Sequence, residues 1–306
     1  MSSWKGKTRG GVTGHKIFIY ILKKSGINAA YALLKFVAAY YILSAPTATK
    51  NIYKYFREIH NYSRLKAIGA VYKNFYLFGQ TLIDKVAIIA GIENKFTYTL
   101  DGENYLKALG SSDRGGILIS GHLGNWEIAG YMLKNISMKI NIVMFEAEQG
   151  KIKGYLDKVM KNQVVNIIPI KKDLSHIFLI NKALRNKEII CMHGDRFVEG
   201  SRIDAVNFMG KDAFFPLGPF TIAAKLKVPF TFVYALKGKD FKYHLSATPP
   251  VNSENMEPQE ILHSYVKSLE TKIKEYPLQW FNYFDFWSKD LKGGVFEQVD
   301  YEKRTN

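Results

Sequence analysis

The chain has 306 residues, and 47% of them are hydrophobic and 14% aromatic, a composition that supports a sizeable core and argues against disorder. Its formal net charge of +16 suits an anionic partner, such as a nucleic acid, an anionic lipid or an acidic protein. A single cysteine, Cys191, excludes an internal disulfide framework and fits a reducing compartment.

The amino-terminal region combines basic charge with long apolar runs. Residues 1–60 hold ten Lys or Arg but only one acid, Glu58. The basic residues are interleaved with apolar and aromatic ones, which favours a membrane surface over a nucleic acid. Residues 27–45 carry one charge, Lys35, and are just long enough to cross a bilayer. Basic residues on both sides leave open whether this segment spans the membrane or lies on it.

The rest of the chain is expected to form an α/β domain. Residues 49–92 have apolar positions at helical spacing, so we expect residues 1–95 to be a membrane-associated helical region. From about residue 101 short apolar strands alternate with helices, which is typical of a layered sheet flanked by helices, here assigned to residues 96–306. The expected strands are 117–120, 140–145, 166–170, 188–193, 229–236 and 242–247. The expected helices are 104–109, 126–135, 151–162, 173–186, 218–226 and 257–275.

The segment Ser120-Gly-His-Leu-Gly-Asn-Trp-Glu127 carries the candidate chemistry. His122 and Glu127 would lie about 140° apart on one continuous helix, so they meet only if His122 precedes the helix. Gly121 and Gly124 favour such a turn, and Asn125 is a suitable N-cap. In that arrangement Glu127 would orient His122, which would act as a general base on a hydroxyl group. Taken alone, this spacing is a weak signal, and an ordinary loop is the alternative.

This segment resembles the active-site block of the bacterial lipid A biosynthesis acyltransferases, the lauroyl and myristoyl transferases. They belong to the His-x4-Asp/Glu lysophospholipid and glycerol-phosphate acyltransferase group, so the resemblance implies that group's layered α/β fold. It spans roughly residues 15–290, with His-Leu-Gly-Asn-Trp-Glu as its most specific part. The downstream blocks that match in order are Gly194-Asp-Arg196, Asn207-Phe-Met-Gly210, Phe215-Pro-Leu-Gly-Pro219, Val228-Pro-Phe230 and Pro277-Leu-Gln-Trp280.

The resemblance implies an enzyme that moves a fatty acyl chain from an acyl carrier protein thioester to a hydroxyl of a lipid A precursor. It implies a location at the cytoplasmic face of the cell inner membrane, with no cofactor and no metal. His122 and Glu127 would be catalytic, and the substrate would contact Asn125, Asp195, Arg196 and Arg202. Another lipid acceptor, such as an amino-lipid, a lysophospholipid or a polyene precursor, is an alternative, as is a non-catalytic membrane scaffold.

One departure from the family pattern concerns the oxyanion. The family has an Arg after the strand that corresponds to residues 140–145, whereas this chain has Glu146 and Glu148 there. The group that stabilises the oxyanion is therefore not identified by the sequence. His193, at the end of a predicted strand, is a candidate to face the same cleft, although a histidine satisfied by the backbone is the more common case.

Overall fold

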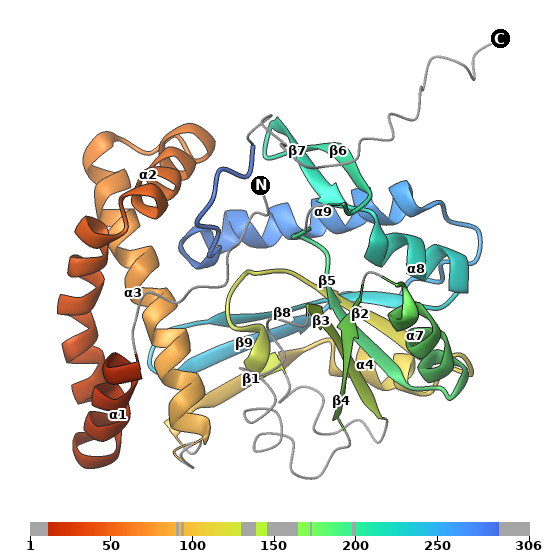
Figure 1. The fold of residues 1–306 in the computed structure, drawn as a ribbon, viewed down its shortest axis with the longest axis horizontal. Coiled ribbons are helices and arrows are strands. Elements are labelled where there is room, and N and C mark those ends of the chain that lie inside the picture. Colours follow the sequence, from red (N-terminus) through yellow and green to blue (C-terminus); the bar gives the residue numbers. More distant parts are fainter. Residues whose placement is uncertain are drawn as a thin grey trace.

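The structure is a computed structural model that describes residues 12–89, 92, 95–129, 139–145, 165–171, 173–197 and 200–287. A twisted sheet lies at the centre, with long amino-terminal helices along one side and further helices over its two faces (Figure 1). The expected helices at 126–135 and 151–162 fall wholly or partly outside the described residues.

The amino-terminal helices are α1 (Val12–Ser44), α2 (Pro46–Lys54), a π-helical turn η1 (Tyr55–Ile59) and α3 (Arg64–Ile89). Gly26 has φ 79° inside α1 and divides the helix at a kink, a backbone conformation that glycine adopts without strain. Among the described residues, Ile17–Ser44 is the helical stretch long and apolar enough to cross a membrane. It nevertheless buries one face, including Leu22 and Leu34, against the protein.

Within the described residues seven strands form the main sheet, in the order β1-β9-β8-β2-β5-β3-β4. Every neighbouring pair is parallel except β8 and β9, which are antiparallel. The strands are β1 (Thr97–Asp101), β2 (Gly116–Ser120), β3 (Ile140–Phe145), β4 (Val165–Ile170), β5 (Ile189–His193), β8 (Phe230–Lys237) and β9 (Lys242–Ala247).

The remaining elements are helices and one hairpin. The hairpin, β6 (Ile203–Phe208) and β7 (Lys211–Pro216), turns through Met209 and Gly210, which both have positive φ. The other helices are α4 (Glu103–Gly110), α7 (Ser175–Arg185), α8 (Gly218–Leu226) and α9 (Pro258–Glu275), with short 3-10 turns η3 (Trp126–Ala129) and η4 (Pro277–Gln279).

The layered α/β class predicted from the sequence is confirmed, and all six expected strands are present with ends shifted by at most one residue. β1 and the β6–β7 hairpin were missed. β1 is largely exposed, and the hairpin alternates buried and exposed positions too briefly to stand out.

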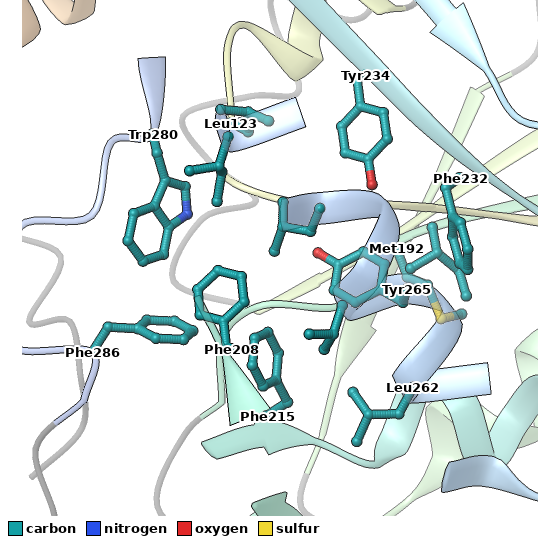
Figure 2. Close-up of a cluster of buried hydrophobic side chains, with 14 of the residues drawn as sticks. Leu123, Met192, Phe208, Phe215, Phe232, Tyr234, Leu262, Tyr265, Trp280 and Phe286 are labelled. Carbon is teal, nitrogen blue, oxygen red and sulfur yellow. The ribbon is translucent and has the colours of Figure 1, made fainter. Parts of the chain in front are cut away.

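Two hydrophobic clusters lie on opposite faces of the sheet. Ile117 and Ile119 of β2 belong to one cluster and Leu118 to the other, because successive side chains of a strand point to opposite faces. Helices α1 and α3 contribute residues to both clusters, so the helical region and the sheet share their cores. Figure 2 shows the aromatic part of the first cluster, where Tyr265 of α9 and Trp280 lie among Phe208 and Phe215 of the hairpin.

Candidate active site

The candidate site lies at the carboxyl ends of two neighbouring parallel strands. β2 ends at Ser120 and β5 at His193, and these two residues are directly paired in the sheet. His122 follows β2 by two residues and Asp195 follows β5 by two residues, so the parallel register brings them together. Ligands of open α/β sheets bind at this edge. Gly121 is needed for the approach, because a Cβ there would lie 2.7 Å from the Tyr265 hydroxyl oxygen.

His122 makes two hydrogen bonds to one carboxylate. Its backbone N–H donates to Asp195 Oδ2 at 2.7 Å, and its Nδ1 lies 2.8 Å from Asp195 Oδ1. An ionised carboxylate only accepts, so Nδ1 carries the proton and the lone pair of the neutral ring is on Nε2. The side chain of His122 is 18% exposed and that of Asp195 only 2%. This is the arrangement of a general base with its orienting acid.

Asp195 is ionised in this setting. Burial alone would raise the pKa of its carboxyl group, but the charge and hydrogen bond of His122, together with Arg196 and His193, outweigh burial and hold that pKa well below its usual range. The carboxylate is therefore negative at neutral pH, and it would stabilise an imidazolium formed on His122.

Glu127 does not occupy the place predicted for it. It lies in η3, and its Oε1 is 2.6 Å from Nζ of Lys85 on α3, with both side chains mostly buried. The acid on Nδ1 of His122 is Asp195 instead, a residue that the family resemblance assigns to substrate binding. The physical reason is topological, since β5 delivers Asp195 to the side of the His122 ring whereas η3 leads Glu127 toward α3.

Asn125, expected to contact the substrate, is 4% exposed and faces the interior. Its amide Nδ2 donates to the Thr81 carbonyl and to the Tyr243 hydroxyl, each at 3.3 Å. Its backbone N–H donates to Ala235 at 2.8 Å, and Gly124 beside it has φ 71°. A Cβ at Gly124 would lie 2.1 Å from the Ala235 carbonyl oxygen, so the motif is pressed directly onto β8. Asn125 therefore positions the motif.

A buried ion pair is hydrogen-bonded to Tyr243, which contacts the Asn125 amide. Lys237 Nζ of β8 lies 2.6 Å from Asp84 Oδ2 of α3, and the two side chains are 4% and 0% exposed. The Asp84 carboxylate also accepts hydrogen bonds from the hydroxyls of Tyr31 on α1 and Tyr243 on β9. This network links α1, α3 and the sheet to Tyr243, whose hydroxyl accepts a hydrogen bond from Asn125. Sequence reasoning missed it, because Asp84 and Lys237 are 153 residues apart.

The two arginines expected to bind substrate anions lie in different places. Arg196 is half-buried beside Asp195, and its Nη2 donates to the Phe281 carbonyl at 3.0 Å. Arg202 is exposed just before β6, and its carbonyl accepts from Leu217. Arg196 thus lies beside the His122–Asp195 pair, whereas Arg202 belongs to the base of the hairpin.

His193 also lies at this edge. Side-chain ligand atoms of His122, His193 and Asp195 all lie within 4.8 Å of one another, a spacing that would suit a metal ion. Both oxygens of Asp195 are engaged by His122, however, and Nδ1 of His193 lies 2.9 Å from the Ser120 hydroxyl. The observed hydrogen bonds are compatible with an acid–base site.

The site thus combines a parallel-rich α/β sheet with a His122–Asp195 pair at the carboxyl ends of β2 and β5. The family model "Bacterial lipid A biosynthesis acyltransferase" matches residues 14–288. The chain belongs to this family and is an acyltransferase.

A solved structure is also similar, that of the 1-acyl-sn-glycerophosphate (LPA) acyltransferase from Thermotoga maritima. It is 16% identical, with 81% of this chain and 97% of that chain covered and a TM-score of 0.40. No curated protein matches the chain.

Proposed function

We propose that the protein transfers a fatty acyl chain from an acyl carrier protein thioester to a hydroxyl group of a lipid A precursor, with His122 as the general base. The observation that carries this proposal is the pairing of His122 Nδ1 with the buried Asp195 carboxylate, within a chain of this family. Neutral His122 then has a lone pair on Nε2, which is what proton abstraction from a hydroxyl requires.

The reaction needs no covalent enzyme intermediate. The acceptor hydroxyl gives its proton to Nε2 of His122 as its oxygen forms a bond to the thioester carbonyl carbon, and the carbonyl oxygen becomes an oxyanion. Collapse of this intermediate breaks the carbon–sulfur bond. The leaving thiolate takes the proton back from His122, so the products are an ester and a thiol. Asp195 stabilises the imidazolium between these two steps.

Arg196 is proposed as the contact for an anionic group of the acceptor, because its half-buried guanidinium lies beside the His122–Asp195 pair. Guanidinium groups bind phosphates through paired hydrogen bonds. The net charge of +16 suits both an acidic carrier protein and a phosphorylated glycolipid.

Attachment to the cytoplasmic face of the inner membrane is proposed through an apolar surface on α1 and α3. We define the apolar membrane face as Phe36, Tyr40 and Leu43 of α1 with Leu65 and Ile68 of α3, which are 55% to 84% exposed. The α1 residues follow at helical spacing on the side opposite the buried face. Tyr72 of α3 donates to the Lys35 carbonyl at 3.2 Å and keeps the two helices together. These contacts favour a helix lying on the bilayer over an isolated span.

The proposal is tested by incubating membranes that contain the protein with labelled lauroyl or myristoyl acyl carrier protein and a tetra-acylated lipid A precursor, followed by mass spectrometry of the lipid. A precursor heavier by one acyl chain is expected. Parallel reactions with a lysophospholipid or an amino-lipid as acceptor test the alternatives. Absence of transfer to the lipid A precursor, with transfer to another acceptor, would replace the proposed substrate.

A further inference from the structure

The ring of His193 lies against that of His122. Their centroids are 4.5 Å apart and their planes are tilted by 36°. The edge of the Trp126 ring lies against His193 on another side, with centroids 5.0 Å apart. His193 is thus held beside His122 by ring contacts, and the side-chain hydrogen bond of His122 goes to Asp195 and not to His193.

One ring nitrogen of His193, Nδ1, is hydrogen-bonded to Ser120. Nδ1 of His193 lies 2.9 Å from the Ser120 hydroxyl oxygen. The hydroxyl can donate to Nδ1 or accept from it, depending on which ring nitrogen carries the proton. When Ser120 donates to Nδ1, the single proton of a neutral His193 is on Nε2.

His193 remains neutral over the working range of the enzyme. Burial removes the hydration of its imidazolium, and His122 disfavours a second charge, so the pKa of His193 falls to about 3 despite the nearby Asp195. A neutral imidazole with a proton on Nε2 is a hydrogen-bond donor that does not compete with His122 for the proton of the substrate.

We infer that Nε2–H of His193 donates a hydrogen bond to the thioester carbonyl oxygen as it becomes the oxyanion, an inference that rests on the proposed acyl transfer. In a reactive complex the carbonyl carbon lies about 3–3.5 Å from the attacking hydroxyl oxygen, which His122 holds. The inferred position of the carbonyl oxygen is next to the His193 ring, whose centroid lies 4.5 Å from that of His122. His193 supplies the donor that the sequence alone left unidentified. Its proton stays on Nε2 throughout, so the proton balance of the reaction is unchanged.

Two amide replacements separate donation to the substrate from a purely structural role. In His193→Asn the amide can occupy the position of Nδ1 and keep the bond to Ser120, but nothing replaces Nε2. In His193→Gln the amide nitrogen reaches the position of Nε2, but the bond to Ser120 is lost. Both variants are compared with the wild-type enzyme in kcat, KM and thermal unfolding, with lauroyl acyl carrier protein and the tetra-acylated precursor as substrates.

His193→Asn is expected to lower kcat by about a hundredfold to a thousandfold with little change in KM, as for loss of one oxyanion donor. His193→Gln is expected to retain more activity than His193→Asn. The acidic limb of the pH–rate profile, set by the base, is expected to stay in place in both variants. If the wild-type enzyme transfers acyl chains and His193→Asn keeps its kcat, or falls less than His193→Gln, the inference alone is overturned. If the wild-type enzyme transfers nothing, the proposed function and this inference fail together.

A spectroscopic measurement tests the inference without turnover. In protein labelled with 15N-histidine, the signals absent from the His193→Gln spectrum belong to His193. A protonated Nε2 and an unprotonated Nδ1 are expected at pH 7. A protonated Nδ1 would overturn the inference even if His193→Asn proved unstable.

Discussion

The carboxylate of Asp195 contacts His122 twice, through the backbone N–H at 2.7 Å and through Nδ1 at 2.8 Å. Oδ2 of Asp195 therefore holds the backbone of the turn after β2, and Oδ1 keeps the ring proton of His122 on Nδ1. Asp195 is delivered by β5, the neighbour of β2, so the distance between the two residues is determined by the sheet itself. The position of His122 is therefore set by the pairing of two adjacent strands.

Replacing Asp195 by Asn is predicted to lower kcat by about a hundredfold to ten-thousandfold. The Asn amide can donate to Nδ1, which shifts the ring proton to Nε2 and removes the lone pair that abstracts the substrate proton. Steady-state rates measure the effect, and thermal unfolding serves as the control for folding.

Replacing Glu127 by Gln is predicted to cost much less, on the order of tenfold or below. Glu127 pairs with Lys85, and its loss loosens η3 without removing the orienting acid. Equal losses in Glu127→Gln and Asp195→Asn would restore Glu127 to the direct role predicted from the sequence.

The buried pair of Lys237 and Asp84 is predicted to be strongly coupled. Lys237→Met leaves Asp84 charged and buried, which should lower the free energy of unfolding by about 3–5 kcal/mol. Adding Asp84→Asn removes the unpaired charge and keeps an acceptor oxygen for one of the two tyrosine hydroxyls, so the double variant should be more stable than Lys237→Met. Denaturant unfolding in detergent checks this. A double variant with the summed losses of the two single variants would show no coupling.

The protein is predicted to lose stability as the pH falls below about 6.5. Burial lowers the pKa of His193 to about 3. Burial, with the charge of Lys66 nearby, lowers the pKa of His60 to about 4. A histidine in the unfolded chain has a pKa of about 6.5. Between these values the unfolded chain binds protons that the native protein does not, so acid favours unfolding. His60→Gln should make the free energy of unfolding less dependent on pH between about 4 and 6.5. An unchanged slope would contradict the assignment for His60.

The apolar membrane face is predicted to hold the protein on anionic vesicles. Phe36→Gln, Tyr40→Gln and Leu43→Gln together should release it, because these side chains are exposed and their loss leaves the buried face of α1 intact. Phe178→Gln with Leu179→Gln on α7 is the matched control, since these apolar side chains are also exposed. Sedimentation with vesicles measures binding. Equal release by both sets would show that membrane affinity is not specific to α1.

The sequence predicted the main strands because they are short and mostly apolar, and some, such as β2 and β8, are buried on both faces. It also predicted His122 in a turn after a strand, since Gly121 and Gly124 loosen the backbone on either side of it, and Gly124 has φ 71°. Sequence spacing did not reveal the acid on His122, because Asp195 lies 73 residues away and approaches only through the pairing of β2 with β5. Spacing favoured Glu127 because it is near in sequence, whereas the fold turns it toward Lys85.

The central claim is that Nε2 of His122 is the base that accepts the proton of the acceptor hydroxyl. The most direct measurement is the rate of acyl transfer by His122→Asn, in which the amide can still donate to Asp195 but no group replaces Nε2. A loss of about a hundredfold or more, in a protein that unfolds at the wild-type temperature, is the predicted result. Transfer at a rate close to that of the wild-type enzyme would contradict the claim.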